Sequence, residues 1–326
     1  MIINMNNISV IIPAYNNEKT IEYVLKSLLD QNIDKTNLEI IVIDDASQDD
    51  TFIKCANFGI NSIKNEINIG LAASLNKGII MSKNDIIVTL HADTIPLTKT
   101  WLDKLVNPLQ NLDVAACCSL QSSPLSNGSD HFLSEILLYG GVKDHNALNN
   151  KADSYKKDVL LKIGLFDEKR YQTAGEDEDL ALRLRLSGFK VIGTDAKVIH
   201  KHFFNVNSNF GCYQKILKKE YDFGQAGGVL RRKFPFHKFG NYLFPEVLPF
   251  FYDGFFRSFI IYSLLIPYVN LLSLSILILF SFKNINNMYK KFPKFKYLLL
   301  YPLFNISRWV IYSMGFLIGL IKGQQY

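Results

Sequence analysis

Four acidic side chains stand next to one another at Glu176, Asp177, Glu178 and Asp179, directly before apolar residues and arginines at helical spacing. Carboxylates this close repel one another, so a plain surface helix gains little from them. At the N-terminus of a helix the macrodipole relieves part of that repulsion, and a carboxylate fixed there can serve as a general base. We therefore expect a helix to begin at this cluster; the alternative is that one of the acids only caps it.

Two further acidic groups, Asp44-Asp45 and His91-Ala92-Asp93, each follow an apolar run that is typical of a buried strand. The segment Pro13–Tyr15 follows a third such run. Strands this apolar are covered on both faces, which indicates a parallel sheet flanked by helices. Ligands bind beyond the carboxyl ends of such strands. The sequence thus predicts one site at which all three segments meet.

The front half of the chain alternates strand and helix patterns at short spacing. Strands are expected at 8–12, 39–43, 61–64, 85–90, 190–192 and 197–199, and helices at 18–29, 49–57, 70–81 and 156–164. Residues 121–151 are rich in Ser, Asn and Gly around one apolar stretch, 132–139, and are expected to form a loop region over the site. This alternation predicts an α/β class with a doubly wound, mostly parallel sheet.

The composition differs between the two parts of the chain: the N-terminal part is acidic, and the C-terminal part is basic and apolar. The 326 residues are 48% hydrophobic and 13% aromatic, which excludes a disordered protein. Residues 201–326 hold 16 Lys and Arg against 4 Asp and Glu, whereas residues 1–200 hold 20 against 26. Because the basic residues adjoin long aliphatic runs, we expect an anionic membrane surface, not nucleic acid, as the partner. The four cysteines form no Cys-x-x-Cys pair, and the N-terminus resembles no signal peptide, so we expect reduced thiols and a cytoplasmic catalytic part.

Five segments within roughly the first 205 positions carry short motifs. They are Ser9-Val-Ile-Ile-Pro-Ala-Tyr-Asn-Asn-Glu18, Val42-Ile-Asp-Asp-Ala-Ser-Gln-Asp-Asp-Thr51, Asn65 to Gly78, Leu90-His-Ala-Asp-Thr94, and Gly164-Leu-Phe-Asp167 with Gly175-Glu-Asp-Glu-Asp-Leu180 and Arg183 to Gly188. Any one of them is weak evidence alone, but together they occur in the order typical of glycosyltransferase family 2, which this part of the chain resembles.

The resemblance implies a GT-A-like nucleotide-binding fold and a transferase that uses a nucleotide-diphosphate sugar and inverts the anomeric centre in one displacement. It also implies a role for individual residues. Pro13, Ala14, Tyr15 and Glu18 are expected to line the nucleoside pocket, and Asp45, with Asp44 as a substitute, is expected to contact the base or ribose. His91, Ala92 and Glu176 are expected to make further contacts with the donor substrate. Asp93 is the expected metal ligand, with His200 near the metal, and Asp177 is the expected catalytic base.

A divalent cation, Mg²⁺ or Mn²⁺, is the implied cofactor, because hard phosphate and carboxylate oxygens favour these ions and the leaving diphosphate gains negative charge. One residue departs from the family's Asp-x-Asp metal motif, since His91 stands in place of the first Asp. An imidazole can still bind Mn²⁺ or hydrogen-bond the donor, but it carries one negative charge fewer.

The C-terminal region is expected to associate with membrane. Residues 258–282 carry no formal charge over 25 positions, and residues 297–321 are apolar except for Arg308. Two spans would export the five lysines of 283–296, against the positive-inside rule, and would bury Arg308. We therefore expect interfacial or re-entrant helices on the anionic cytoplasmic leaflet, with true spans as the alternative.

These expectations divide the chain into a catalytic domain at 1–205, with a nucleotide-binding half at 1–95 and an acceptor-side half at 96–205, a basic connector at 206–254, and membrane-associated helices at 255–326. The predicted function is transfer of a sugar to a hydroxyl of a lipid-linked or cell-surface glycan, hence polysaccharide biosynthesis. One alternative is a non-catalytic nucleotide-sugar binding module, against which Asp177 argues. Another is a processive synthase, for which the chain is short and lacks a Gln-x-x-Arg-Trp segment.

Overall fold

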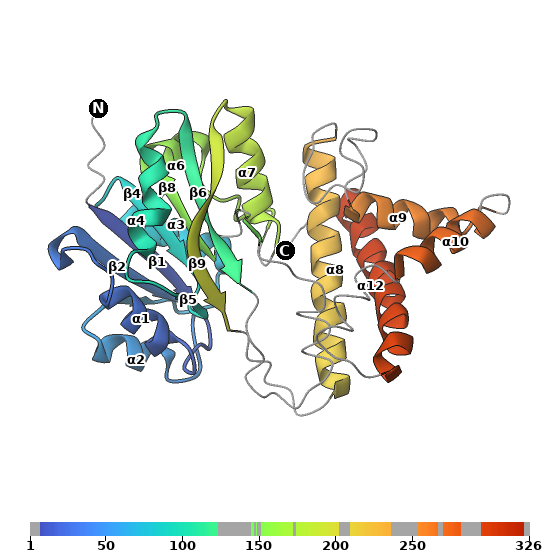
Figure 1. Ribbon diagram of the computed structural model, residues 1–326, viewed down its shortest axis with the longest axis horizontal. Coiled ribbons are helices and arrows are strands. Elements are labelled where there is room, and N and C mark those ends of the chain that lie inside the picture. The colour runs from blue at the N-terminus through green and yellow to red at the C-terminus, as the bar shows by residue number, and fades with distance from the viewer. Residues whose placement is uncertain are drawn as a thin grey trace. The chain divides into compact units, whose positions relative to one another are not determined.

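The computed structural model describes residues 7–122, 145–146, 148, 151–171, 174–201, 209–235, 253–266, 270–281 and 295–322. The chain divides into two compact units, one of Met1–Pro124 with Lys143–His202 and one of Leu125–Val142 with Phe203–Tyr326 (Figure 1). Most of the loop region expected at 121–151, including its apolar stretch 132–139, lies outside the described residues. The division into 1–205, 206–254 and 255–326 stays a prediction.

The first half of the catalytic unit is a parallel sheet with connecting helices. Its strands are β1 (Ile8–Ala14), β2 (Leu38–Asp44), β3 (Asn61–Lys64) and β4 (Ile86–Leu90), and its helices are α1 (Ile21–Leu29), α2 (Thr51–Asn57) and α3 (Leu71–Met81). β1 pairs in parallel with both β2 and β4, and β2 pairs in parallel with β3. Each expected element of this half is present, with boundaries that differ from the expected ones by at most three residues.

Beyond β4 the sheet becomes mixed. β8 (Ala152–Lys156) pairs antiparallel with β4 and with β6 (Val114–Ser122), β9 (Lys190–His200) is parallel to β6, and β5 (Thr94–Pro96) is antiparallel to β9. With β7 (His145–Asn146) beside β6, the described sheet has nine strands, in the order β3-β2-β1-β4-β8-β6-β9-β5 apart from β7. The two short strands expected at 190–192 and 197–199 are one strand, because register shifts let β9 follow β6 throughout. The α/β fold class is as predicted.

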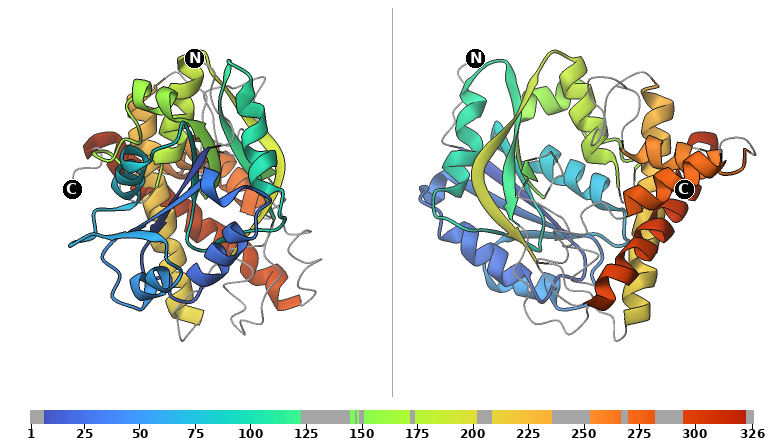
Figure 2. Two further views of the ribbon diagram at one scale, coloured as in Figure 1. Left: turned by 90° about the vertical axis from the view of Figure 1, so that its left-hand side faces the viewer. Right: turned by 45° about the vertical axis from the view of Figure 1, so that its right-hand side comes forward.

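Helices cover both faces of this sheet, which explains why β1, β2 and β4 are apolar at nearly every position. Val10 and Ile12 belong to one buried cluster with residues of α1 and α4 (Trp101–Val106), whereas Ile11 belongs to another with residues of α3, α6 (Lys157–Ile163) and α7 (Glu176–Leu186). α3 lies so close to β1 that a Cβ on Gly78 would overlap Ile11 Cγ2. The helices on each side appear in two views in Figure 2.

The second unit is helical: α8 (Asn209–Lys233), α9 (Asp253–Ser263), α10 (Asn270–Ser281) and α12 (Phe295–Lys322). The uncharged segment 258–282 is therefore not one helix, since α9 ends at Ser263 and α10 begins at Asn270. Among the described residues, only Tyr301–Ile321 is a helix long and apolar enough to cross a membrane.

α8 and α12 lie side by side and run in the same direction (Figure 1). Two glycines of each helix face the partner's backbone so closely that a Cβ would overlap a carbonyl oxygen: Gly224 and Gly228 on α8, Gly315 and Gly319 on α12. Such G-x-x-x-G pairs allow helices to approach closely. Arg308, the charge within the apolar segment, lies with its Nε 2.6 Å from Glu220 Oε1, and Glu220 is buried.

Candidate functional site

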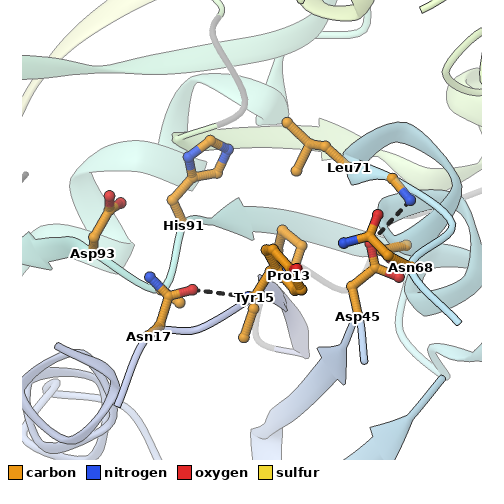
Figure 3. A pocket seen from close by; sticks show the side chains of 12 residues that line it. Pro13, Tyr15, Asn17, Asp45, Asn68, Leu71, His91 and Asp93 are labelled. Atoms are coloured by element: carbon orange, nitrogen blue, oxygen red, sulfur yellow. Dashed lines mark hydrogen bonds between the residues drawn. The ribbon is translucent and has the colours of Figure 1, made fainter. Parts of the chain in front are cut away.

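A pocket of about 300 Å³ opens in the first unit, beyond the carboxyl ends of β1, β2 and β4 (Figure 3). Seven of the residues predicted from the sequence lie in its wall, and the others there come from the turn after β1 and from the start of α3. The lining residues are Pro13, Ala14, Tyr15, Asn17, Asp45, Asn68, Gly70, Leu71, Ser74, His91, Ala92 and Asp93. Figure 3 shows Asp45 and Asp93 on opposite sides of the pocket, with Pro13 and Tyr15 between them.

Asp45 is fixed by hydrogen bonds that also shape the pocket wall. Its Oδ1 accepts from Asn65 Nδ2 and from the Ile69 amide, both at 2.8 Å, and its Oδ2 accepts from the Gly70 amide at 2.9 Å. The next residue, Ala46, has a φ of 64°, a left-handed conformation that costs a non-glycine residue about 1–3 kcal/mol. Asp45 therefore ties the end of β2 to the start of α3.

Asp44 and Glu18 do not line the pocket. Asp44 is fully buried, and the nearest cation is Lys64, whose Nζ lies 3.8 Å from Asp44 Oδ2. Asp45, the residue after β2, lines the pocket, and Asp44, the last residue of β2, does not. Glu18 Oε2 accepts a hydrogen bond of 3.4 Å from the Asp50 amide instead.

Three side chains gather where β4 turns into β5: His91, Asp93 and His200. One potential ligand atom of each lies within 4.8 Å of the others, and His200 Nε2 is 3.1 Å from Asp93 Oδ1. The pairing of β5 with β9 places Thr94 opposite His200, which brings the C-terminal end of β9 to this turn. The Thr94 amide donates to the His91 carbonyl at 3.0 Å and closes the turn itself.

His91 has the chemistry of a metal ligand. Its Nε2 is buried and, among the described residues, has no hydrogen-bond partner. Burial lowers the pKa of His91 to about 3, with Lys151 and His200 adding to the effect and Asp93 opposing it. A neutral imidazole beside a carboxylate and a second imidazole is a donor set that fits a divalent cation.

Asp177 lies half-buried in the first turn of α7, which begins after Gly175 in a left-handed conformation. Its Oδ1 accepts from the Glu178 amide at 2.8 Å. Burial raises the pKa of Asp177, although that hydrogen bond and the charge of Lys151 oppose the rise. The carbonyl of Lys151 accepts from the His91 amide at 3.0 Å, so Lys151 adjoins the metal-type cluster and acts electrostatically on Asp177 as well. No local pattern singles out Lys151, because its place depends on the pairing of β4 with β8.

The other acids of the cluster have separate places. Asp179 is fully buried, with its Oδ2 2.7 Å from Arg183 Nε, so this acid is structural. Glu176 is buried at the helix start, and neither it nor Asp177 lines the pocket. Asp177 combines partial exposure with a pKa raised by burial.

Comparison with known proteins gives the family. Residues 9–170 match the sequence profile described as glycosyl transferase family 2. An uncharacterized protein of Methanocaldococcus jannaschii is 34% identical over 67% of this chain and 94% of its own length. The chain belongs to glycosyl transferase family 2.

Two other proteins are similar to this chain over nearly its whole length. A Methanococcus voltae protein is 25% identical over 98% of both chains, and it is named dolichyl N-acetyl-α-D-glucosaminyl phosphate 3-β-D-2,3-diacetamido-2,3-dideoxy-β-D-glucuronosyltransferase. The structure of a mannosyltransferase from Pyrobaculum calidifontis, in complex with GDP-Man and Mn²⁺, superposes with a TM-score of 0.61 at 16% identity, covering 95% of this chain and 87% of that one. The enzyme is therefore a glycosyltransferase with a GT-A-like fold.

Proposed function

We propose that this enzyme transfers a sugar from a nucleotide-diphosphate sugar, with inversion, to a hydroxyl of a lipid-linked or cell-surface glycan at the cytoplasmic face of the membrane. One observation carries the proposal. One pocket at the carboxyl ends of parallel strands has Asp45 on one side and Asp93 on the opposite side. Asp93 belongs to the cluster of His91, Asp93 and His200. That arrangement matches a ligand with a hydrogen-bonding nucleoside at one end and a diphosphate at the other.

The nucleoside would lie along Pro13–Tyr15. Tyr15 is 48% exposed at the pocket, so its ring can pack on a base or ribose. Asp45 already accepts three hydrogen bonds, yet a carboxylate has about four lone-pair sites and can take one more from a base or ribose. Asp44 has no access to the pocket, so we assign the nucleoside contact to Asp45.

The cluster of His91, Asp93 and His200 would hold a divalent cation, Mg²⁺ or Mn²⁺, which neutralises charge on the departing diphosphate. Asp177 would accept the proton of the acceptor hydroxyl as its oxygen attacks the anomeric carbon. The bond to the diphosphate oxygen breaks and its electron pair leaves with the nucleotide. Because attack comes from the face opposite the leaving group, the anomeric configuration inverts. A pKa raised by burial makes Asp177 a stronger base than an exposed aspartate.

A lipid-linked acceptor is supported by the name of the Methanococcus voltae relative, which refers to a dolichyl phosphate sugar. The second unit offers apolar surface for such a partner. Six apolar side chains of α9, α10 and the residues between them are more than half exposed: Phe259, Leu265, Ile266, Leu271, Leu272 and Leu279. We propose that they enter the outer part of the cytoplasmic leaflet.

The packing of α12 favours association with the surface over a span. α12 lies along α8, with Tyr213 against Phe304 and Glu220 paired with Arg308. At the same level α8 exposes three lysines, at 215, 218 and 219. A bilayer core around Tyr301–Ile321 would have to enclose them, at about 2.5–3.5 kcal/mol each. Because Glu220 pairs with Arg308, the charge of Arg308 by itself no longer argues against a membrane span. The three exposed lysines do argue against it.

Membrane attachment can be tested with vesicles that contain phosphatidylglycerol. Leu271→Glu should lower flotation with the vesicles severalfold, whereas Leu112→Glu, at an equally exposed leucine of the first unit, should not. A tag at the C-terminus should be digested by protease on the same side as the catalytic unit. Protection of the tag inside sealed vesicles would show a span and reject the interfacial arrangement.

The transferase reaction is tested by nucleotide-sugar hydrolysis and transfer in detergent with membrane lipid extract, with EDTA or with added Mn²⁺. We expect cation-dependent activity, and we expect Asp177→Asn to abolish transfer while it retains donor binding. A protein that binds no nucleotide sugar would contradict the proposal. One that binds the sugar without transfer, in wild type as in Asp177→Asn, would be a binding module.

A further inference from the structure

The turn after β1 is held by side chains of the turn after β2. Three successive backbone amides of the first turn donate to side chains of the second: Asn16 to Ser47 Oγ at 2.9 Å, Asn17 to Thr51 Oγ1 at 2.7 Å, and Glu18 to Asp49 Oδ2 at 3.1 Å. We call the side chains of Ser47, Asp49 and Thr51 the clasp. None of the three is among the residues that line the pocket, whereas Tyr15 and Asn17 of the held turn are.

Two residues of the held turn carry this constraint into the pocket. Asn17 Oδ1 accepts from the Tyr15 amide at 2.9 Å, the bond drawn between them in Figure 3. Asn16, between them, has a φ of 54°, a left-handed conformation that persists in a non-glycine residue only where its surroundings impose it. We infer that the clasp, through Thr51 above all, positions Tyr15 and Asn17 for the nucleoside without touching it. The inference rests on the proposed function for the nature of the ligand.

Thr51 is the member of the clasp at which its hydrogen bonds converge. Its side chain is fully buried, and its hydroxyl accepts from the Asn17 amide and donates to Asp49 Oδ1. Burial raises the pKa of Asp49, but hydrogen bonds from Thr51 and the Glu18 amide outweigh burial and hold that pKa below its usual range. Asp49 is therefore a charged acceptor at neutral pH. Loss of the Thr51 hydroxyl would deprive Asn17 and Asp49 of a partner at once.

A turn that is ordered in advance favours binding, because the ligand need not spend interaction free energy on ordering it. Asp93 and the cation cluster lie on the other side of the pocket from Asp45, away from the clasp's own contacts. A looser turn should therefore raise the Kd of the nucleotide and the KM of the donor, with little change in kcat.

The test compares Thr51→Val with Thr51→Ser in the full-length enzyme in detergent. Valine keeps the branched shape without the hydroxyl, and serine keeps the hydroxyl. Calorimetry gives the Kd of UDP, GDP and dTDP with Mn²⁺ held constant, and nucleotide-sugar hydrolysis gives the donor KM and kcat. For the nucleotide that wild type binds most tightly, Thr51→Val should raise Kd, and with it the donor KM, about tenfold while kcat changes less than about twofold. Thr51→Ser should stay within about threefold of wild type.

Ser82→Ala is the control, since it removes another buried hydroxyl of the same unit, one that donates to the Ile79 carbonyl after α3. It should leave Kd unchanged. Should Thr51→Val fail to fold, Asp49→Asn at a half-buried position serves as the second variant. Its side-chain amide can accept from the Glu18 amide or from the Thr51 amide, but not from both, so Kd should rise about threefold.

Unchanged Kd and KM in Thr51→Val, or in Asp49→Asn if the first variant does not fold, would overturn the inference and leave the proposed function standing. An equal loss of affinity in Thr51→Ser would do the same, because the hydroxyl would then not be the cause. A fall in kcat at constant KM would also overturn it. A wild-type enzyme that binds none of the three nucleotides and no nucleotide sugar would instead reject the proposed function, and the inference with it.

Discussion

Replacement of Arg183 by alanine should destabilise the catalytic unit, because this side chain ties α7 to the segment after α6. Arg183 Nε lies 2.7 Å from Asp179 Oδ2, and Nη1 and Nη2 donate to the carbonyl oxygens of Ile163 and Leu165 at 2.8 and 2.6 Å. The same helix carries Asp177 in its first turn. A loss of these contacts therefore bears on both stability and catalysis.

The expected loss in the free energy of unfolding follows from the burial of Asp179. The Asp179 side chain is 0% exposed, and removal of the partner of a buried charge costs about 3–5 kcal/mol. Arg183→Lys keeps the charge but has one nitrogen in place of three, so we expect a loss of about 1–3 kcal/mol. Arg185, on the same helix, is exposed, and Arg185→Ala should change the free energy of unfolding by about 0.5 kcal/mol or less.

Each of the two units contains one of the chain's two tryptophans, so tryptophan fluorescence can follow the unfolding of one unit at a time. Trp101 is buried in the sheet's core, where its Nε1 donates to Ser119 Oγ at 3.0 Å, and Trp309 lies in α12. In a Trp309→Phe background, urea unfolding followed by fluorescence therefore reports the catalytic unit through Trp101. Equal midpoints for Arg183→Ala and Arg185→Ala would refute the reasoning.

Catalysis provides a second measurement. If Asp177 is the base, Arg183→Lys should lower kcat while the KM for the donor changes little, because the pocket wall does not include α7. A rise in the donor KM with constant kcat would indicate instead that α7 serves donor binding.

Four further predictions concern stability, pH and helix packing. Burial raises the pKa of Asp177, so transfer should decline, as pH falls, at a higher pH than an ordinary aspartate would give. The raised pKa also means that this carboxyl's contribution to stability is lost as pH rises through it, so Asp177→Asn should be at least as stable as wild type towards urea at pH 7. Gly78→Ala should cost about 1–3 kcal/mol, seen in the Trp101 transition, because its Cβ would overlap Ile11; an unchanged midpoint would contradict this close packing. Gly224→Val should separate α8 from α12 at Tyr312 and shift the Trp309 emission to longer wavelength in a Trp101→Phe background, and unchanged emission would reject the tight crossing.

Local patterns predicted the parallel half of the sheet because each of its elements carries its own signal. Strands β1, β2 and β4 are apolar at nearly every position, and short helices follow them at regular spacing. The antiparallel β8 was not predicted, since Ala-Asp-Ser-Tyr-Lys has neither an apolar run nor strict alternation. Its polar residues are buried by tertiary pairing with β4 and β6, which no local signal reveals.

The helical unit shows the same limit. Arg308 in an apolar run argues against a membrane span in the sequence, but its partner Glu220 stands 88 positions away, on a different helix. The facing glycines of α8 and α12 are likewise visible as two G-x-x-x-G motifs, yet only the crossing shows that they face each other.

The sequence by itself showed apolar strands that end in acidic residues, and this pattern indicated the α/β class and the expectation of nucleotide-sugar chemistry. Local burial and helix periodicity depend on neighbours within a few positions, so they can be read along the chain. Tertiary structure decided which side chains meet. It placed Asp45 and not Asp44 in the pocket wall, and it brought His200 to His91 and Asp93 through the pairing of β5 with β9. Register between strands far apart in the chain depends on the packing of the whole sheet.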